Sequence, residues 1–308
     1  MSMAKAKPFV KWAGGKSQLI DEIQRRLPFD IEQRNDLTYI EPFVGGGAVL
    51  FWILQRYPSI QQAVINDVNP KLICTYRVVK EWVDELIREL HNLQDRYLEL
   101  NEEQRKEFFL AMRKRFNNPQ ATELEIASLF IFLNRTCFNG LYRVNSKGLF
   151  NVPFGRYANP TICNDETLRL DSELLQRVII LNGDYETTEQ YITPNTFMYL
   201  DPPYRPLSET SSFTSYAEGD FNDGEQVRLK LFADRMVAQG CKVLLSNSDP
   251  KGKDPQDEFF DNLYLGYIID RVYATRMVNA NASKRGRLTE LMMRSNYQIV
   301  NKELKSVM

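Results

Sequence analysis

Residues 39–50 read YIEPFVGGGAVL, an apolar run followed by three glycines and a second apolar run. The first run predicts a buried strand over 37–43, and the second predicts a helix over 48–57 that Pro58 closes. Glycines between a strand and a helix are typical of α/β folds that bind a ligand at the carboxyl ends of their strands. Without a Cβ atom, the backbone there can approach a ligand closely. The spacing is not G-x-G-x-x-G, so a dinucleotide is not favoured.

The rest of the chain alternates strand and helix patterns around that segment. Residues 70–136 read as helical, and the glycine-containing stretch 138–157 reads as a hairpin or loop. Strands separated by helices predict a doubly wound, mostly parallel α/β sheet. We expect one catalytic domain from 1–74 and 166–308, with a mainly helical insert at 75–165. The further predicted strands are 63–67, 177–182, 196–201, 242–247 and 267–273, with 288–295 pairing at an edge.

Composition narrows the class of protein. The chain has 308 residues, is 43% hydrophobic and carries a formal net charge of −1. It is long enough for one domain with a sizeable insert, and it holds no apolar run that predicts a membrane span. Its N-terminus lacks a signal core, so we expect a cytoplasmic protein. The cysteines lack CxxC spacing and are expected to be reduced thiols: Cys74, Cys137, Cys163 and Cys241.

Two basic segments stand out against the nearly neutral average charge. Residues 134–157 and 271–287 contain arginines and lysines and no acidic residue. Each could be an ordinary basic loop. Together, interleaved with aromatic and amide side chains, they favour a nucleic-acid partner.

Acidic residues follow two of the predicted strands. Asp67 ends the strand after the glycine loop, about 20 residues on, where a carboxylate can accept hydrogen bonds from ribose hydroxyls. Asp184 and Tyr185 follow the strand at 177–182 and could hydrogen-bond and stack on an adenine ring, although a plain Gly-Asp turn would explain them too. Glycine loop and acid together indicate an adenosine-containing ligand.

The tetrapeptide Asp201-Pro202-Pro203-Tyr204 ends the apolar strand at 196–201. Its two prolines fix φ and remove two backbone donors, so the local backbone offers acceptors only. This set suits a planar group that carries an NH2. Asp201 accepts a hydrogen bond from one N–H, the Pro202 carbonyl accepts a hydrogen bond from the other, and Tyr204 stacks on the ring. A simple proline turn is the competing interpretation.

DPPY together with EPFVGGG (41–47) resembles the amino-methyltransferases that act on exocyclic amines of nucleic-acid bases. The order of KWAGGK (11–16), EPFVGGG, a middle insert and DPPY is similar to that of Dam-like DNA adenine methyltransferases, closest to the DpnM-type modification methylases. The resemblance continues through 138–157, 206–216 and 244–249, so it covers nearly the whole chain. It implies a Rossmann-like methyltransferase fold and methyl transfer from S-adenosylmethionine to the 6-amino group of a flipped adenine in double-stranded DNA.

The resemblance also implies roles for single residues. KWAGGK would lie over the cofactor pocket, with Lys16 facing the methionine part and Lys11 facing DNA. The implied catalytic residues are Asp201, Pro202, Pro203 and Tyr204. The implied cofactor residues are Trp12, Ala13, Gly14, Gly15, Lys16, Glu41, Pro42, Phe43, Gly45, Gly46, Gly47, Asp67, Asp184, Tyr185 and Asp201.

For DNA, we expect the 134–157 hairpin in the major groove and methylation within 5′-GATC-3′. Arg143 is a fork donor that suits the two acceptors of guanine. The polar stretch 208–224 is long for a connector and reads as a flap over DNA and the flipped base. The implied DNA-binding residues are Lys11, Arg135, Asn139, Leu141, Arg143, Pro153 and Arg156, with Leu141 and Pro153 against thymine methyl groups and Arg135 and Arg156 on phosphates.

Other classes of protein fit less well. A Walker A loop ending in Gly15-Lys16-Ser17 would need a glycine where Val10 stands. No Pro-Cys pair exists, which disfavours a cytosine ring methylase with a cysteine nucleophile. A non-catalytic DNA-binding module and a cytosine 4-amino methyltransferase on the same scaffold stay open. His91 lies in a charged helical segment and reads as a surface residue, and we expect no metal site. The family allows a cognate restriction endonuclease in the same system, without stable contact.

Overall fold

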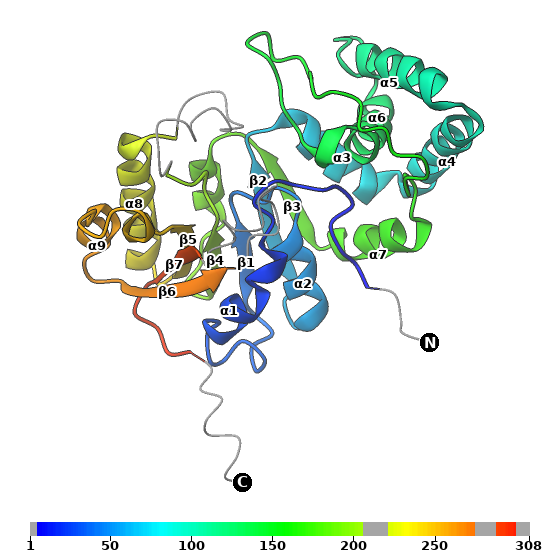
Figure 1. The fold of residues 1–308 in the computed structure, drawn as a ribbon. Helices are drawn as coiled ribbons and strands as arrows, with labels where there is room; N and C mark the ends of the chain where they lie inside the picture. Colours follow the sequence, from blue (N-terminus) through cyan, green and yellow to red (C-terminus); the bar gives the residue numbers. More distant parts are fainter. Residues whose placement is uncertain (1–4, 206–220, 275–287, 300–308) are drawn as a thin grey trace. The chain divides into compact units, whose positions relative to one another are not determined.

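The computed structural model describes residues 5–205, 221–274 and 288–299 of the chain (Figure 1). Most of the predicted flap over 208–224 and of the basic segment 271–287 lies outside these ranges. The chain forms a seven-stranded sheet in the order β3-β2-β1-β4-β5-β7-β6. Its strands are β1 (Thr38–Glu41), β2 (Gln62–Asp67), β3 (Val178–Asn182), β4 (Thr196–Leu200), β5 (Lys242–Ser248), β6 (Ile268–Ala274) and β7 (Leu288–Arg294).

Parallel pairing dominates the centre of this sheet. β1 pairs in parallel with both β2 and β4, and β4 pairs in parallel with β5. All four residues of β1 and all five of β4 are buried, as expected for strands covered on both faces. The predicted doubly wound, mostly parallel sheet is therefore confirmed.

The last strand corrects one prediction. The segment at 288–295 was expected at an edge, yet β7 lies between β5 and β6 and pairs with both in antiparallel fashion. The reason lies in its sequence: Leu291, Met292 and Met293 are consecutive apolar residues, and all three are buried. A strand that is apolar on both faces is stable only inside the sheet.

The described chain divides into two compact units. The first comprises 1–15, 44–56 and 66–184, and the second comprises 16–43, 57–65 and 185–308. The first is mainly helical, and α3, α4 and α5 pack on α6. Its helices are α2 (Ala48–Arg56), α3 (Pro70–Glu81), α4 (Val83–Glu99), α5 (Glu102–Phe116), α6 (Glu123–Thr136) and α7 (Asp165–Leu175).

Local sequence sets the ends of these helices. The side chain of Asn69 accepts hydrogen bonds from two backbone N–H groups of α3, whose first residue is a proline. Asn101 forms a capping box with Gln104 at the start of α5. Residues 127–133 of α6 are all buried, which makes this helix the centre of the unit.

The second unit holds α1 (Ile20–Arg25), α8 (Asp223–Ala238) and α9 (Phe259–Leu263) beside β1 and β4–β7. In Figure 1, α8 and α9 lie beside the strands of this unit, and α8 packs on β5. A short 3-10 helix over Lys16–Gln18 precedes α1. No helix among the described residues is both long enough and apolar enough to cross a bilayer.

Candidate active site

In the second unit, the DPPY residues follow directly on β4. Asp201 is held from two sides: Lys16 Nζ lies 3.0 Å from Asp201 Oδ1, and Ser246 of β5 donates a hydrogen bond to the same oxygen at 2.9 Å. Ser246 in turn lies 3.0 Å from the hydroxyl of buried Tyr199. Lys16 and Ser246 therefore both approach this carboxylate at the same oxygen, Oδ1.

Burial and charge oppose each other at Asp201. Burial raises the pKa of this carboxyl, and the Lys16 ammonium and the Ser246 hydroxyl lower it. The side chain of Lys16 is only 8% exposed. A buried ammonium at this distance favours the ionised carboxylate, which is the form that can accept hydrogen bonds from an amine.

Tyr204 is fixed at both its ring and its hydroxyl. Its hydroxyl donates a 2.7 Å hydrogen bond to Glu290 Oε2 in β7, and Lys16 Nζ lies 4.4 Å from its ring centroid. Burial, followed by the charges of Asp201 and Glu290, raises the pKa of Tyr204, so the phenol stays protonated and remains a donor. Sequence reasoning missed Glu290. The only signal was a carboxylate inside an apolar strand segment, LTELMMR.

Buried amides hold the backbone of DPPY. Gln226 of α8 donates to the Pro203 carbonyl at 3.2 Å, and Asn247 of β5 donates to Gln226 Oε1 at 3.1 Å. Asn247 Oδ1 accepts the backbone N–H of Arg205 at 3.2 Å. Gln226 and Asn247 are fully buried, so these bonds set the position of the Pro203 carbonyl and of the Arg205 backbone N–H that follow Pro202.

Three further predicted cofactor residues lie in the second unit near the end of β1. Glu41 is buried and accepts a 2.8 Å hydrogen bond from Tyr39, and Pro42 is buried beside it. The rings of Phe43 and Tyr185 lie 5.2 Å apart, and Phe221 contacts both. Tyr185 is only 4% exposed and also packs on Phe232, so the half-buried rings of Phe43 and Phe221 carry the aromatic surface on which a purine can stack.

In the first unit, the glycine loop packs against Trp12. A Cβ atom on Gly45 would lie 2.8 Å from the indole, and one on Gly46 would lie 2.9 Å from the Trp12 Cβ. Gly47 has a φ of +76°, and a Cβ there would clash with the Tyr76 hydroxyl. These glycines therefore make room for protein side chains. Of the other predicted KWAGGK residues, Ala13, Gly14 and Gly15 are exposed.

Asp67 closes the glycine loop from the end of β2. Its Oδ2 accepts the Gly45 backbone N–H at 3.1 Å, and its Oδ1 accepts that of Asn69 at 2.9 Å. Burial raises the pKa of Asp67, and these two hydrogen bonds lower it. The Asp67 carbonyl accepts the Gly183 backbone N–H at 3.3 Å, so exposed Asp184 lies next to a residue bound to Asp67.

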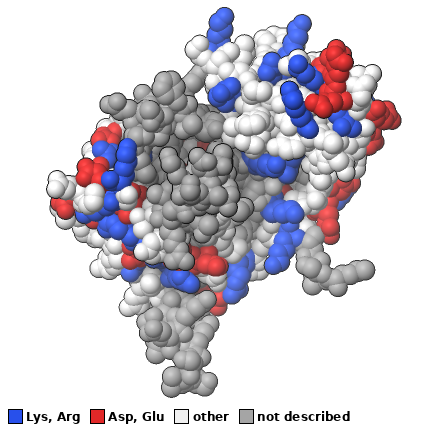
Figure 2. Space-filling model, in the orientation of Figure 1, with Lys and Arg blue, Asp and Glu red and all other residues white. Residues whose placement is uncertain are grey.

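The 134–157 segment of the first unit forms the predicted hairpin. Val144 and Phe150 pair in an antiparallel bridge, with a turn over Asn145–Gly148. Arg143 is exposed, and its Nε donates to Asn151 across the hairpin at 2.8 Å. Figure 2 shows Lys and Arg side chains gathered over the part of the surface where Figure 1 draws this segment and the helices beside it.

The other predicted DNA-binding residues fall into two groups. Arg135 has its guanidinium largely inside the unit. It donates a hydrogen bond to the Phe9 carbonyl at 2.8 Å, and burial lowers its pKa. Leu141 is half-buried. The rest have exposed side chains: Lys11, Asn139, Pro153 and Arg156, the last of which lies 3.9 Å from Glu102.

Comparison with known proteins decides the family. A family model described as D12 class N6 adenine-specific DNA methyltransferase matches residues 12–278. The chain belongs to this family. Type II methyltransferase M.MjaIII from Methanocaldococcus jannaschii is 49% identical over 91% of this chain and 95% of its own, and DNA adenine methylase from Vibrio cholerae is 36% identical over 94% and 96%. The solved structure of rRNA methyltransferase aviRa from Streptomyces viridochromogenes covers 96% of this chain and 87% of its own, at a TM-score of 0.34 and 13% identity, too remote to carry an argument.

The protein is therefore an adenine-specific DNA methyltransferase, and its substrate is DNA. Enzymes of this family use S-adenosylmethionine as methyl donor. Each unit by itself offers groups that suit parts of that cofactor: in the first, the Asp67 carboxylate at the end of β2 suits ribose hydroxyls, and in the second, the half-buried ring of Phe43 suits an adenine. The predicted family, enzyme class and cofactor are confirmed.

Proposed function

We propose that this enzyme methylates the 6-amino group of an adenine that is flipped out of duplex DNA, within the sequence 5′-GATC-3′. The observation that carries the chemistry is the position of Asp201, whose two contacts from Lys16 and Ser246 both fall on Oδ1. Oδ2 accepts a hydrogen bond from one N–H of the amine. The Pro202 carbonyl accepts a hydrogen bond from the other.

This arrangement makes the adenine amine, a poor nucleophile, more reactive. The lone pair of an adenine amine is delocalised into the ring, and two acceptors at fixed positions favour a pyramidal nitrogen whose lone pair points away from them. Asp201 stabilises the positive charge that develops on nitrogen, and it is already oriented before the reaction begins. S-adenosylmethionine supplies the electrophilic methyl group. Alignment of nitrogen and methyl gives much of the remaining acceleration.

Tyr204 offsets the cost of extracting the base. An adenine amine is inaccessible inside a duplex, and flipping costs a few kcal/mol. Stacking on an aromatic side chain is worth about 1–3 kcal/mol per base. Because the hydroxyl of Tyr204 is tied to Glu290, the ring meets the base in one orientation. Glu290 is thus a positioning residue for the flipped adenine.

The remaining roles are supported by the family resemblance and by the exposure of each residue. Asp67 binds the ribose of the cofactor, and Phe43, supported by buried Tyr185, stacks on its adenine. Exposed Arg143 reads a guanine, and exposed Lys11 and Arg156 contact DNA. Residues 75–165 form the target-recognition domain. Arg135 supports this domain from within, because its guanidinium is bound to the Phe9 carbonyl. The 5′-GATC-3′ target is supported by the likeness of the hairpin to the Dam-like family.

Methylation of plasmid DNA, read by modification-aware sequencing, tests base and target together. We expect 6-methyladenine in GATC with the wild-type chain. Asp201→Asn keeps the shape of the side chain and should lose on the order of a hundredfold or more in rate. Methylcytosine as product would overturn the adenine assignment, and methyladenine in another sequence would overturn only the GATC reading. The type II naming of M.MjaIII supports a further proposal, a cognate endonuclease that cuts the same sequence.

A further inference from the structure

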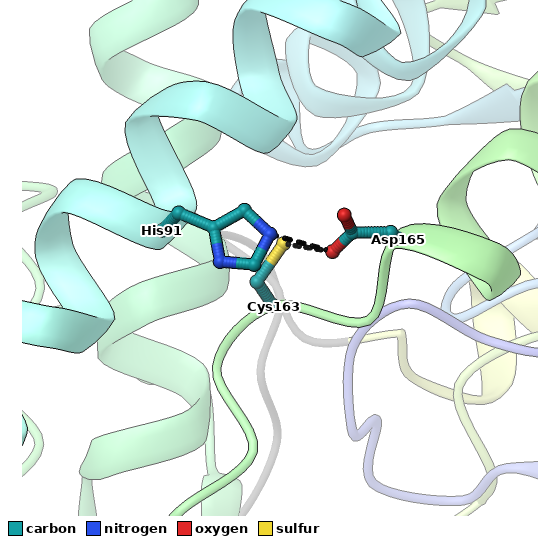
Figure 3. A group of neighbouring side chains, drawn as sticks. All are labelled: His91, Cys163 and Asp165. Carbon is teal, nitrogen blue, oxygen red and sulfur yellow. Dashed lines mark hydrogen bonds and ion pairs between the residues drawn. The ribbon is translucent and has the colours of Figure 1, made fainter.

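Three potential metal ligands meet in the first unit, at residues that methyl transfer does not use. They are His91 on α4, Cys163 in the segment before α7, and Asp165, the first residue of α7 (Figure 3). His91 Nε2 lies 2.8 Å from Asp165 Oδ1, and Cys163 Sγ lies 3.3 Å from the same oxygen. All three ligand atoms lie within 4.8 Å of one another. The sequence analysis expects His91 at the surface, where its side chain is indeed 43% exposed, and it expects no metal site.

The segment that carries Cys163 is held in place independently of the cluster. Gln94, one turn along α4 from His91, accepts the backbone N–H groups of Ile162 and Cys163 at 2.9 and 3.1 Å. Asn164 caps α7 by accepting the Thr167 backbone N–H at 2.9 Å. The thiol is therefore positioned against α4 by bonds that none of the three ligand atoms makes. A binding site needs such preorganisation.

The three side chains differ in solvent exposure, so that one side of the cluster is open to solvent. Cys163 is 6% exposed, while the side chains of His91 and Asp165 are 43% and 46% exposed. The sulfur lies at the bottom, and imidazole and carboxylate form the rim. An ion could therefore enter from solvent and keep a water molecule on its open side.

We propose that His91, Cys163 and Asp165 bind one divalent ion of the zinc class, with water as the fourth ligand. One sulfur, one imidazole nitrogen and one carboxylate oxygen form a set that suits Zn²⁺ and Co²⁺ and does not suit Mg²⁺ or Ca²⁺, which prefer oxygen. Tetrahedral zinc with bonds of about 2.0–2.3 Å needs ligand atoms about 3.3–3.7 Å apart. The 2.8 Å between His91 Nε2 and Asp165 Oδ1 must widen by about 0.5 Å, and His91 Nε2 and Cys163 Sγ, which lie within 4.8 Å of each other, must come within about 3.7 Å; rotation of the half-exposed His91 and Asp165 side chains permits both changes.

The ion has to compete with the bonds that the cluster already makes. Burial raises the pKa of the Cys163 thiol to about 12, and the charge of nearby Asp165 adds to that effect. A metal must therefore displace a proton from sulfur, so we expect binding weaker than at a dedicated four-ligand zinc site. A bound ion would tie α4 to the start of α7, both in the first unit.

Cobalt binding tests the proposal with tag-free, metal-free protein. We expect one equivalent of Co²⁺ to give a thiolate-to-cobalt charge-transfer band and the visible bands of tetrahedral cobalt, both removed by competing Zn²⁺. The chain contains a single histidine. One imidazole signal in nitrogen NMR should therefore move on addition of Zn²⁺.

Variants assign the ligands. Cys163→Ser should remove the charge-transfer band, while Asp165→Asn and His91→Gln should each weaken binding at least tenfold. Cys74→Ser is the matched control, since Cys74 is a half-exposed thiol in the same unit whose sulfur contacts only the Glu123 carbonyl among the hydrogen bonds of described residues. Circular dichroism checks that each variant is folded. If Cys163→Ser does not fold, the cobalt affinity of Asp165→Asn tests the proposal instead. No cobalt spectrum at millimolar metal, a band that survives Cys163→Ser, or a band lost in Cys74→Ser would each overturn the proposal.

Discussion

Replacement of Lys16 by methionine should slow methyl transfer in a way that depends on pH. The ammonium of Lys16 lies 3.0 Å from Asp201 Oδ1, and the two side chains are 8% and 19% exposed. Burial raises the pKa of Asp201, and the charge of Lys16 is the largest influence that lowers it. Catalysis requires the ionised carboxylate, so activity is lost as pH falls through this pKa. Without Lys16 the pKa rises further, and the acid limb of the rate profile moves to higher pH.

The size of the shift follows from the geometry. Two unit charges 3.0 Å apart interact by at most about 5–6 kcal/mol at an effective dielectric constant near 20. Neighbouring opposite charges shift measured carboxyl pKa values by about 1–3 units, or roughly 1.4–4 kcal/mol. We therefore expect the acid limb of Lys16→Met about 1–3 pH units above that of the wild type. Below the limb, the rate should fall by roughly tenfold for each unit.

Single-turnover methyl transfer at saturating DNA and cofactor, measured across the pH range, provides the assay. Ser246→Ala is the matched control, because it removes the hydrogen bond of a neutral hydroxyl to the same ionised oxygen, worth about 1.5–3 kcal/mol, and leaves the Lys16 charge in place. Its limb should move by about 1–2 units at most, and the double variant with Lys16→Met should move further than either single variant. If Lys16→Met lowers the rate equally at every pH, then Lys16 does not control the ionisation of Asp201. The role that the family implies for it, at the methionine part of the cofactor, would then stand alone.

Three further predictions concern other parts of the chain. Glu290→Ala should lower methyl transfer about tenfold and weaken the fluorescence change of 2-aminopurine at the target position, whereas Glu290→Gln, which can still accept from Tyr204, should restore most of both. Arg143→Ala should relax discrimination at one guanine by about 1–3 kcal/mol, and Arg156→Ala should weaken all sequences alike; equal uniform losses would show that the hairpin does not read bases. Burial raises the pKa of Asp171 to about 8 from 3.8, so its stabilising contribution is complete below the lower value and is lost as pH rises towards 8. Asp171→Asn should therefore gain stability over the wild type as pH rises, by up to about 1.4 kcal/mol per unit in guanidinium unfolding, while Asp95→Asn on the surface should show no such trend.

Local sequence was sufficient to predict the sheet and the main helices. The strands of the centre are short apolar runs flanked by glycine, proline or polar residues, and the helices of the first unit begin at Asn69, Asn101 and Thr122, which cap them. The position of β7 was not predictable in this way. It depends on antiparallel pairing with β5 and β6, which are set by contacts far apart in the chain. An apolar run shows that a strand is buried but does not identify its neighbours.

In the candidate site, too, the residues of a local motif were predictable, and the residues that reach it from distant parts of the chain were not. The DPPY tetrapeptide could be identified as a functional site from the sequence. Two prolines after an apolar strand leave few structural roles for the aspartate and tyrosine beside them. The supporting residues could not be identified in this way, because Ser246, Gln226 and Glu290 belong to no motif and reach the site from β5, α8 and β7. Polar residues inside otherwise buried elements were the available signal. Each of them must find a partner, and here that partner is a residue of the tetrapeptide.

The glycines show how two motifs that look separate in sequence depend on one another. KWAGGK and EPFVGGG each suggested a wall for a ligand, yet the structure packs the Trp12 side chain within 3.0 Å of the places that Cβ atoms on Gly45 and Gly46 would take. The same indole stacks on Tyr142 of the hairpin at 5.7 Å and on Phe130 of α6 at 6.3 Å. One aromatic side chain thus joins the glycine loop to the segment with the exposed arginines, all within the first unit. The glycines lack Cβ atoms primarily so that the Trp12 side chain can pack against the loop. A larger residue in the loop would therefore displace Trp12 and the hairpin residue Tyr142 that stacks on it, and it would also obstruct any ligand of the loop.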